Sequence, residues 1–255
     1  MGWSTISARC WTISLPVLMD IEIQSSWWLD LHTFATILRM RTPIVPFLSG
    51  SPIMVAGPTN CGKTYWVNRL LMNDMFTQKV ASVLYCYGVY QDFFAEMKSN
   101  STIECPIRFH AGLPSKEDLK SLADGRLHLV VLDDLMEFIV KSQEMQQLFT
   151  KYCHHLNMSA IFISQNLFHQ GPQARSISLN CHVVVLFANK RDESQIRIFA
   201  RQLYPTKWRR FLIAYEEEMN FEFSYLVVDC TPSIPRALKV RSAIFPGERT
   251  CVYDI

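Results

Sequence analysis

The strongest constraint on the fold is an eight-residue loop that lies between an apolar run of strand length and a helical segment. Residues 57–64 read Gly-Pro-Thr-Asn-Cys-Gly-Lys-Thr and satisfy the pattern G-x-x-x-x-G-K-[ST] at every fixed position. Such a loop curls its backbone N–H groups around phosphate oxygens, and glycine keeps side chains away from the positions of close approach. The sequence therefore predicts a P-loop placed between a strand and a helix.

The whole loop is predicted to bind nucleotide, through Gly57, Pro58, Thr59, Asn60, Cys61, Gly62, Lys63 and Thr64. We expect the Lys63 ammonium to pair with the β- and γ-phosphates and the Thr64 hydroxyl to ligate Mg²⁺. Asn60 tolerates a left-handed backbone, which suits a tight loop. Cys61 precedes a helix N-terminus, which can lower a thiol pKa, although a small residue that simply fits is the favoured interpretation. ATP and Mg²⁺ are the predicted cofactors.

Apolar runs of strand length alternate with helix-length amphipathic segments from Pro46 onward. The predicted strands are residues 53–56, 81–87, 107–110, 127–133, 160–164, 183–187 and 225–229. The predicted helices are residues 63–72, 90–97, 116–122, 137–156 and 193–203. This repeated β–α order predicts an α/β fold with a mostly parallel sheet flanked by helices.

Polar side chains follow two of these strands. Asp133 and Asp134 end the run 127–133, and Gln165 follows the run 160–164. We expect Asp133 to hold Mg²⁺ beside Thr64 and Asp134 to activate the attacking water, while the Gln165 amide bonds the γ-phosphate and that water. Taken alone, the Asp-Asp pair is as typical of a strand that enters a turn as of a catalytic site. A single glutamine after a strand is typical of a polar cap at the strand end. The P-loop upstream favours the catalytic interpretation.

Residues 1–43 differ from the rest of the chain, because they are rich in tryptophan and weakly patterned until about residue 29. We therefore predict an N-terminal extension of unknown role, 1–43, and a P-loop ATPase domain, 44–255. The apolar stretch 10–19 ends at Asp20 and is too short to span a bilayer. The eight cysteines are scattered without a C-x-x-C pair, which is typical of reduced, mostly buried thiols. We expect an intracellular protein that is not secreted and has no membrane partner.

A basic tract in the last third of the chain surrounds Trp208. It consists of Lys190, Arg191, Arg197, Arg201, Lys207, Arg209 and Arg210. Contact with DNA phosphates needs charge but little sequence specificity, so this tract is a candidate DNA surface. A solvated helix face balanced by Glu216, Glu217 and Glu218 explains it equally well, and the net charge of +2 does not decide.

Further matches to one superfamily follow the P-loop in order along the chain. They lie at residues 85–91, 132–136, 149–151, 154–157, 164–168, 175–180, 187, 190–192, 200–205 and 244–248. Over about residues 44–253 the chain resembles the FtsK–HerA superfamily of ATPases, and more narrowly the DNA-packaging ATPases of Polinton/Maverick elements, adintovirus-like viruses and virophages. The resemblance implies a three-layer αβα RecA-like fold with an additional strand between the Walker A and Walker B strands.

The resemblance also assigns roles to single residues. It makes Asp133 the Mg²⁺ carboxylate, Asp134 the water-activating acid and Gln165 the γ-phosphate sensor. Several ring ATPases of the superfamily place a trans-acting arginine between Walker B and the sensor, yet residues 127–165 contain no arginine. Arg175, expected on the loop just past the sensor strand, is the first candidate for this arginine finger, and Arg191 is the second. A surface ion pair is the alternative for either.

The function that the resemblance implies is an Mg²⁺-dependent ATPase that translocates double-stranded DNA. It would form a homo-oligomeric ring, a pentamer or hexamer, and package a viral or virus-like transposon genome with a capsid or portal protein, in the nucleus or at a virion assembly site. One alternative is a replication or repair ATPase acting on single strands, although no helicase motif set is recognisable. Another is a domesticated copy that binds nucleotide or a partner without turnover, against which the intact catalytic set argues.

Overall fold

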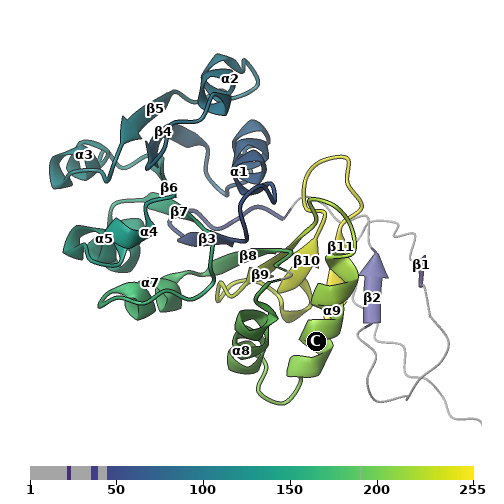
Figure 1. Ribbon diagram of the computed structural model, residues 1–255. Helices are drawn as coiled ribbons and strands as arrows, with labels where there is room; N and C mark the ends of the chain where they lie inside the picture. Colours follow the sequence, from purple (N-terminus) through teal and green to yellow (C-terminus); the bar gives the residue numbers. More distant parts are fainter. Residues whose placement is uncertain (1–21, 24–35, 40–44, 190) are drawn as a thin grey trace, which may run out of the picture.

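The computed structural model describes residues 22–23, 36–39, 45–189 and 191–255, which build one sheet with helices on both faces (Figure 1). Its strands are β1 (Glu22–Ile23), β2 (Thr36–Arg39), β3 (Ile53–Ala56), β4 (Val80–Tyr87), β5 (Ile107–Ala111), β6 (Leu127–Asp133), β7 (Met158–Ser164), β8 (Val183–Phe187), β9 (Tyr225–Asp229), β10 (Val240–Ser242) and β11 (Cys251–Asp254). Their order is β1-β2-β11-β10-β9-β8-β3-β7-β6-β4-β5. The predicted α/β fold is confirmed.

Strands β3 to β8 form the parallel block that positions the site. Within it β7 lies between β3, which leads into the P-loop, and β6, which ends in Asp133, so the predicted additional strand is present. Every residue of β6 is buried, because helices cover both faces of the sheet. Alternate side chains enter opposite cores: Leu129 and Val131 pack on one face, Val130 and Leu132 on the other.

The helical layers follow the chain order. The α-helices are α1 (Lys63–Met72), α2 (Phe93–Ser99), α3 (Lys116–Ser121), α4 (Met136–Ile139), α5 (Gln143–Gln147), α6 (Cys153–His155), α7 (Ala174–Asn180), α8 (Glu193–Leu203) and α9 (Trp208–Glu218); a π-helix, Leu148–Tyr152, and a 3₁₀ turn, Arg236–Leu238, complete the set of described helices. Helices α1 and α2 lie on one face of the sheet, and α7, α8 and α9 on the other (Figure 1). Among the described helices, none is long and apolar enough to cross a membrane.

Several predicted bounds are confirmed and one predicted helix is wrong. The strands at 53–56, 127–133, 183–187 and 225–229 and the helices at 63–72 and 193–203 have the predicted bounds. The single helix predicted at 137–156 is instead the series α4, α5, the π-helix and α6. Ser142 interrupts it, because its backbone is extended and its side chain accepts a hydrogen bond from the Met145 amide, which starts a new helix there. Helix α2 begins at Phe93, later than predicted.

The far side of the sheet is antiparallel. Strand β9 runs opposite to β8, β10 opposite to β9, and β11 pairs with β10 and β2. The sequence does not predict β2, β10 or β11, which are only three or four residues long. Strand β2 falls within the predicted extension 1–43; apart from β1 and β2 that segment lies outside the described residues, and the boundary at 43 stays a prediction.

Candidate nucleotide-binding site

The P-loop connects the end of β3 to the first turn of α1, as the sequence predicts. Asn60 has φ 62° and Gly62 has φ 101°, so both take the left-handed conformation that the tight curl requires. Gly57 is needed for a different reason. A Cβ atom at this position would lie 2.6 Å from Cβ of Phe187 and 2.8 Å from Sγ of Cys61. The backbone conformation therefore favours glycine at position 62, and the close neighbours exclude a side chain at position 57.

Lys63 lies folded back on its own loop. Its buried ammonium donates to the backbone oxygens of Gly57, 2.7 Å away, and Pro58, 2.6 Å away. These bonds hold a positive charge at the centre of the loop, where phosphate oxygens would compete for it. A lowered pKa for the neighbouring Cys61 thiol is not supported. Burial raises the pKa of Cys61, and the nearby Lys63 only partly opposes that rise. Cys61 is thus better described as a small side chain that fits.

The predicted Mg²⁺ ligands Thr64 and Asp133 meet at the carboxyl edge of the sheet. Thr64 Oγ1 donates to Oδ2 of the buried Asp133 over 3.4 Å, and the hydroxyl of Tyr85 donates to the same oxygen over 2.8 Å. Burial raises the pKa of Asp133, and the Tyr85 and Thr64 hydrogen bonds oppose the rise. Tyr85 comes from the neighbouring strand β4. The sequence gives it no role, because only the pairing of β4 with β6 brings its hydroxyl to the acid.

Asp134 and Gln165 also come together. The Gln165 amide Nε2 lies 3.3 Å from Oδ1 of Asp134, and both side chains are exposed. Asp134 has φ 55°, a left-handed conformation that turns the chain directly after the strand. Gly88 packs against this turn. Its amide donates to the backbone oxygen of Asp133, and a Cβ atom on Gly88 would lie 2.5 Å from the backbone oxygen of Asp134. The predicted water-activating acid and sensor amide therefore form one hydrogen-bonded pair.

A cleft of about 730 Å³ unites these groups. Its walls are Thr59, Asn60, Gly62, Lys63, Thr64, Tyr65, Val89, Gln91, Phe93, Asp133, Asp134, Ile163, Ser164, Gln165 and Phe223. The groups predicted to bind phosphate, to ligate Mg²⁺ and to activate water thus open onto a common space at the ends of β3, β6 and β7. That is the edge at which open parallel sheets bind ligands.

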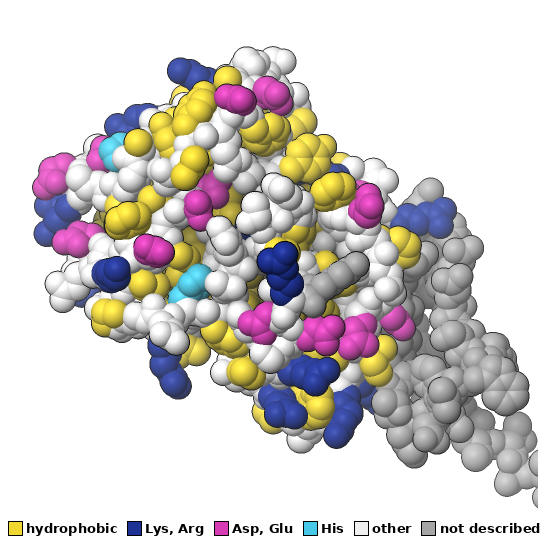
Figure 2. Space-filling view, viewed as in Figure 1, with side chains coloured by type: hydrophobic (Ala, Val, Ile, Leu, Met, Phe, Trp, Pro, Cys, Tyr) yellow, Lys and Arg dark blue, Asp and Glu magenta, His cyan; other side chains and the backbone are white. Residues whose placement is uncertain are grey.

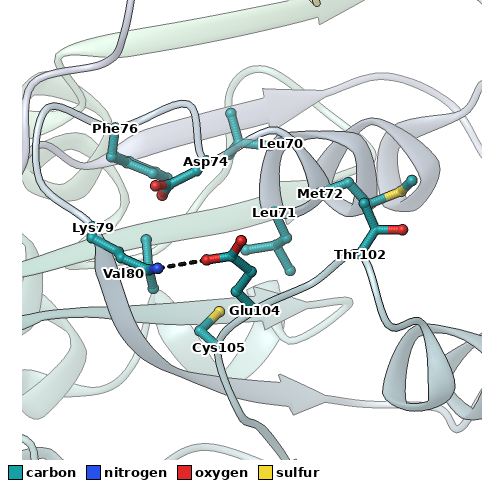
Figure 3. A pocket seen from close by; sticks show the side chains of 10 residues that line it. All are labelled: Leu70, Leu71, Met72, Asp74, Phe76, Lys79, Val80, Thr102, Glu104 and Cys105. Carbon is teal, nitrogen blue, oxygen red and sulfur yellow. Dashed lines mark hydrogen bonds and ion pairs between the residues drawn. The ribbon is translucent and has the colours of Figure 1, made fainter.

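A second hollow, of about 100 Å³, lies at the opposite edge of the sheet, between the end of α1 and the start of β4. Figure 3 shows two of its three charged side chains, Lys79 and Glu104, directed toward one another and joined by an ion pair. Leu70, Leu71 and Phe76 supply apolar walls. Lys79, the one cation among its lining residues, is paired with Glu104, and Asp74 adds a further negative charge, so this hollow does not suit phosphates and is no competitor for the nucleotide site.

Neither arginine-finger candidate lines the cleft. Arg175 was expected on a loop, which is wrong: it lies on the exposed first turn of α7. Helix α7 begins at Ala174, whose side chain is buried. Arg191 is exposed on the connection between β8 and α8, where its amide donates to the Asn189 side chain. Both stay predictions for a residue that acts on a neighbouring subunit.

Five residues of the basic tract lie on the hairpin of α8 and α9, Arg191 precedes α8, and Lys190 lies outside the described residues. The guanidinium groups of Arg201 and Arg209 lie 4.6 Å and 4.5 Å from the Trp208 ring centroid. Figure 2 shows Lys and Arg side chains gathered at the lower end of the molecule, where α8 turns into α9, with acidic side chains next to them. The glutamates expected to balance this charge are Glu216, Glu217 and Glu218. The Glu218 carboxylate accepts hydrogen bonds from the hydroxyls of Ser242 and Tyr253.

Sequence comparison identifies a family. The family model described as "Poxvirus A32 protein" matches residues 52–198, which include the P-loop, Asp133, Asp134 and Gln165. Curated protein sequences give no match.

The solved structures that match this protein in a structural comparison share little sequence identity with it. The DNA-packaging ATPase B204 from Sulfolobus turreted icosahedral virus has 8% identity and a TM-score of 0.49, over 73% of this chain and 95% of that one. The genome packaging NTPase B204 from Sulfolobus turreted icosahedral virus 2, in complex with sulfate, has 10% identity and a TM-score of 0.44, over 72% and 93%. The flagellar accessory protein FlaH from Methanocaldococcus jannaschii has 12% identity and a TM-score of 0.43, over 82% and 91%.

Proposed function

Because this chain belongs to the poxvirus A32 protein family, a family of packaging NTPases, we propose that it is an Mg²⁺-dependent ATPase that drives double-stranded DNA into a capsid. The observation that carries this proposal is the pairing of Asp134 with Gln165 in the cleft that also contains Lys63. A P-loop alone would support nucleotide binding only, since kinases, switches and motors share it. An exposed acid held by an amide adds a group able to activate water.

Nucleotide binding would begin with Lys63. We propose that its ammonium leaves the oxygens of Gly57 and Pro58 and pairs with the β- and γ-phosphates, while the loop amides bond the remaining phosphate oxygens. Thr64 and Asp133 suit an Mg²⁺ ion, because a hydroxyl and a carboxylate oxygen already face each other there. Bound Mg²⁺ would neutralise charge on the β- and γ-phosphates. Tyr85 would orient the Asp133 carboxylate from behind.

Hydrolysis would depend on Asp134 and Gln165. Asp134 would accept the proton of the attacking water, and the Gln165 amide would fix the orientation of that carboxylate and contact the γ-phosphate. We propose that an arginine of a neighbouring subunit, Arg175 first and Arg191 second, completes the site by spreading positive charge over the phosphoryl oxygens. This proposal includes a homo-oligomeric ring, pentameric or hexameric, in which each cleft is closed by the next copy.

DNA contact is proposed for the α8–α9 hairpin. The guanidinium groups of Arg201 and Arg209 both lie against the Trp208 ring, and this contact restricts two flexible, exposed side chains. Guanidinium groups fixed in this way suit repeated contact with the phosphates of a duplex. The narrower proposal, packaging of a Polinton-like transposon genome with a capsid or portal partner, rests on the ordered sequence matches and not on the family match.

The test is ATP hydrolysis by the full chain with and without duplex DNA, over a salt series. We expect duplex DNA to stimulate hydrolysis and the stimulation to weaken steeply as salt rises, because salt competes for phosphate contacts. The double variant Arg201→Gln/Arg209→Gln should reduce the slope of log affinity for duplex DNA against log salt concentration by about two, one for each phosphate contact that is lost.

The matched control is Arg126→Gln, which removes an exposed arginine that pairs with Asp124 before the start of β6, a strand that β7 and β3 separate from β8 in the sheet. It should leave the stimulation and its salt slope unchanged. Equal rates of hydrolysis with and without duplex DNA at every salt concentration would refute the proposed DNA motor.

A further inference from the structure

The nucleotide cleft has two ends, and the proposed chemistry uses only one. Asp134 and Gln165 mark the end at β6 and β7. On the other side of the P-loop strand β3 lie β8 and β9. At that end the cleft is lined by Phe223, on the connection between α9 and β9. No role follows for this residue from the hydrolysis chemistry.

The antiparallel course of β9 brings Phe223 to the P-loop. Phe187, the last residue of β8, pairs with Tyr225, the first residue of β9. The residues just before β9 therefore lie at the same edge of the sheet as the loop that follows β3. A Cβ atom built on Gly62 would lie 3.4 Å from Cδ1 of Phe223, so the phenyl ring stands directly beside the glycine that precedes Lys63.

The local turn presents the ring to solvent. Ser224 Oγ donates to the Phe221 oxygen over 2.9 Å and closes the turn. Phe223 has φ 57°, a conformation that is uncommon for a bulky residue, and its side chain is 68% exposed. A phenyl ring exposed in this way keeps apolar surface in water that a flat ligand would cover.

The order of groups along a nucleotide fixes which part of it reaches this ring. If the γ-phosphate points toward Asp134 and Gln165, the nucleoside must leave the P-loop on the opposite side, toward β8 and β9. Phe223 is the aromatic side chain that lines the cleft there, whereas Tyr65 and Phe93 pack together near the end of β4.

We propose that Phe223 is the stacking platform for the nucleobase, an inference that rests on the proposed nucleotide site. The ligand class is a nucleoside triphosphate whose base covers the exposed face of the ring. Stacking uses the face of a base and tolerates different bases, so ATP and GTP should bind within about tenfold of one another.

The test compares a ligand that has a base with one that has none. Binding of ATPγS, GTPγS and inorganic tripolyphosphate, each with Mg²⁺, is measured by calorimetry on the full chain. The wild-type protein should bind ATPγS about 10- to 100-fold more tightly than tripolyphosphate. Phe223→Ala should remove most of that difference by weakening ATPγS while leaving tripolyphosphate unchanged, and Phe223→Trp should keep it. Phe221→Ala is the matched control, because Phe221 is 65% exposed on the same turn and should change neither ligand.

Two outcomes would overturn the stacking role: unchanged binding of ATPγS by Phe223→Ala, or equal weakening of ATPγS and tripolyphosphate, which would make Phe223 a support for the loop. Failure of the proposed ATPase is separate. A wild-type protein that shows the preference for ATPγS but does not hydrolyse ATP would refute the ATPase and leave the stacking role intact.

Discussion

Asp134→Asn is expected to lower kcat for ATP hydrolysis by about 10²- to 10⁴-fold while ATP binding is retained, because it removes the carboxylate that accepts the proton of the attacking water. The amide is nearly the same size, so the hydrogen-bonded turn around Gly88 is preserved. Phosphate release under saturating MgATP measures kcat, and calorimetry with MgATPγS measures binding.

The matched control is Glu137→Gln, the same chemical change at an exposed carboxylate three positions further along the chain. It should leave kcat unchanged. If Asp134→Asn hydrolysed ATP at the wild-type rate, the Asp134 carboxylate would not be the group that accepts the proton of the attacking water. Its hydrogen bond with Gln165 would then have no role in hydrolysis. If Asp134→Asn instead abolished ATPγS binding, its role would be in holding the nucleotide.

Arg241→Leu is expected to lower the free energy of unfolding by about 3–5 kcal/mol, because it leaves the buried carboxylate of Asp229 without its counter-charge. Arg241 is 1% exposed and Asp229 2%. Nη2 of Arg241 donates to Oδ2 of Asp229 over 3.0 Å, and Nη1 donates to the Leu238 oxygen over 2.6 Å. Burial lowers the pKa of Arg241, and the adjacent Asp229 opposes that shift. Urea unfolding followed by circular dichroism measures the loss.

The double variant Arg241→Leu/Asp229→Asn makes this prediction specific. The asparagine keeps an oxygen for the Thr231 amide, which donates to Oδ1 of Asp229, but carries no charge. It should therefore recover at least about 1 kcal/mol relative to Arg241→Leu alone. Arg126→Leu, at an exposed ion pair, should change stability little. A double variant less stable than Arg241→Leu would show that the unpaired charge is not the cause.

The parts of the fold that the sequence predicts are those in which local pattern and buried environment agree. Strand β6 is apolar apart from His128 and its terminal Asp133 because both its faces are covered, and such a run is visible in the sequence. The P-loop is equally visible, since its glycines and lysine stand at fixed spacing. From these two elements the sequence predicts that Thr64 lies beside Asp133.

The parts that the sequence does not predict depend on contacts between distant elements. Tyr85 reaches Asp133 only through the pairing of β4 with β6, and Phe223 reaches Gly62 only through the reversal of direction at β9. Strands β10 and β11 are too short for a period to be recognised. In residues 137–156 the helical spacing continues through Ser142, although its side chain caps a new helix there.

Displacement of a triplex-forming oligonucleotide from duplex DNA tests the central claim most directly, because only movement along the duplex strips the third strand. We expect the wild-type protein to release the oligonucleotide when ATP is supplied, and not with ATPγS. The Lys63→Ala variant, which lacks the ammonium held at the centre of the P-loop, should release none. DNA-stimulated ATP hydrolysis by the wild-type protein without release of the third strand would contradict the account of this protein as a DNA translocase.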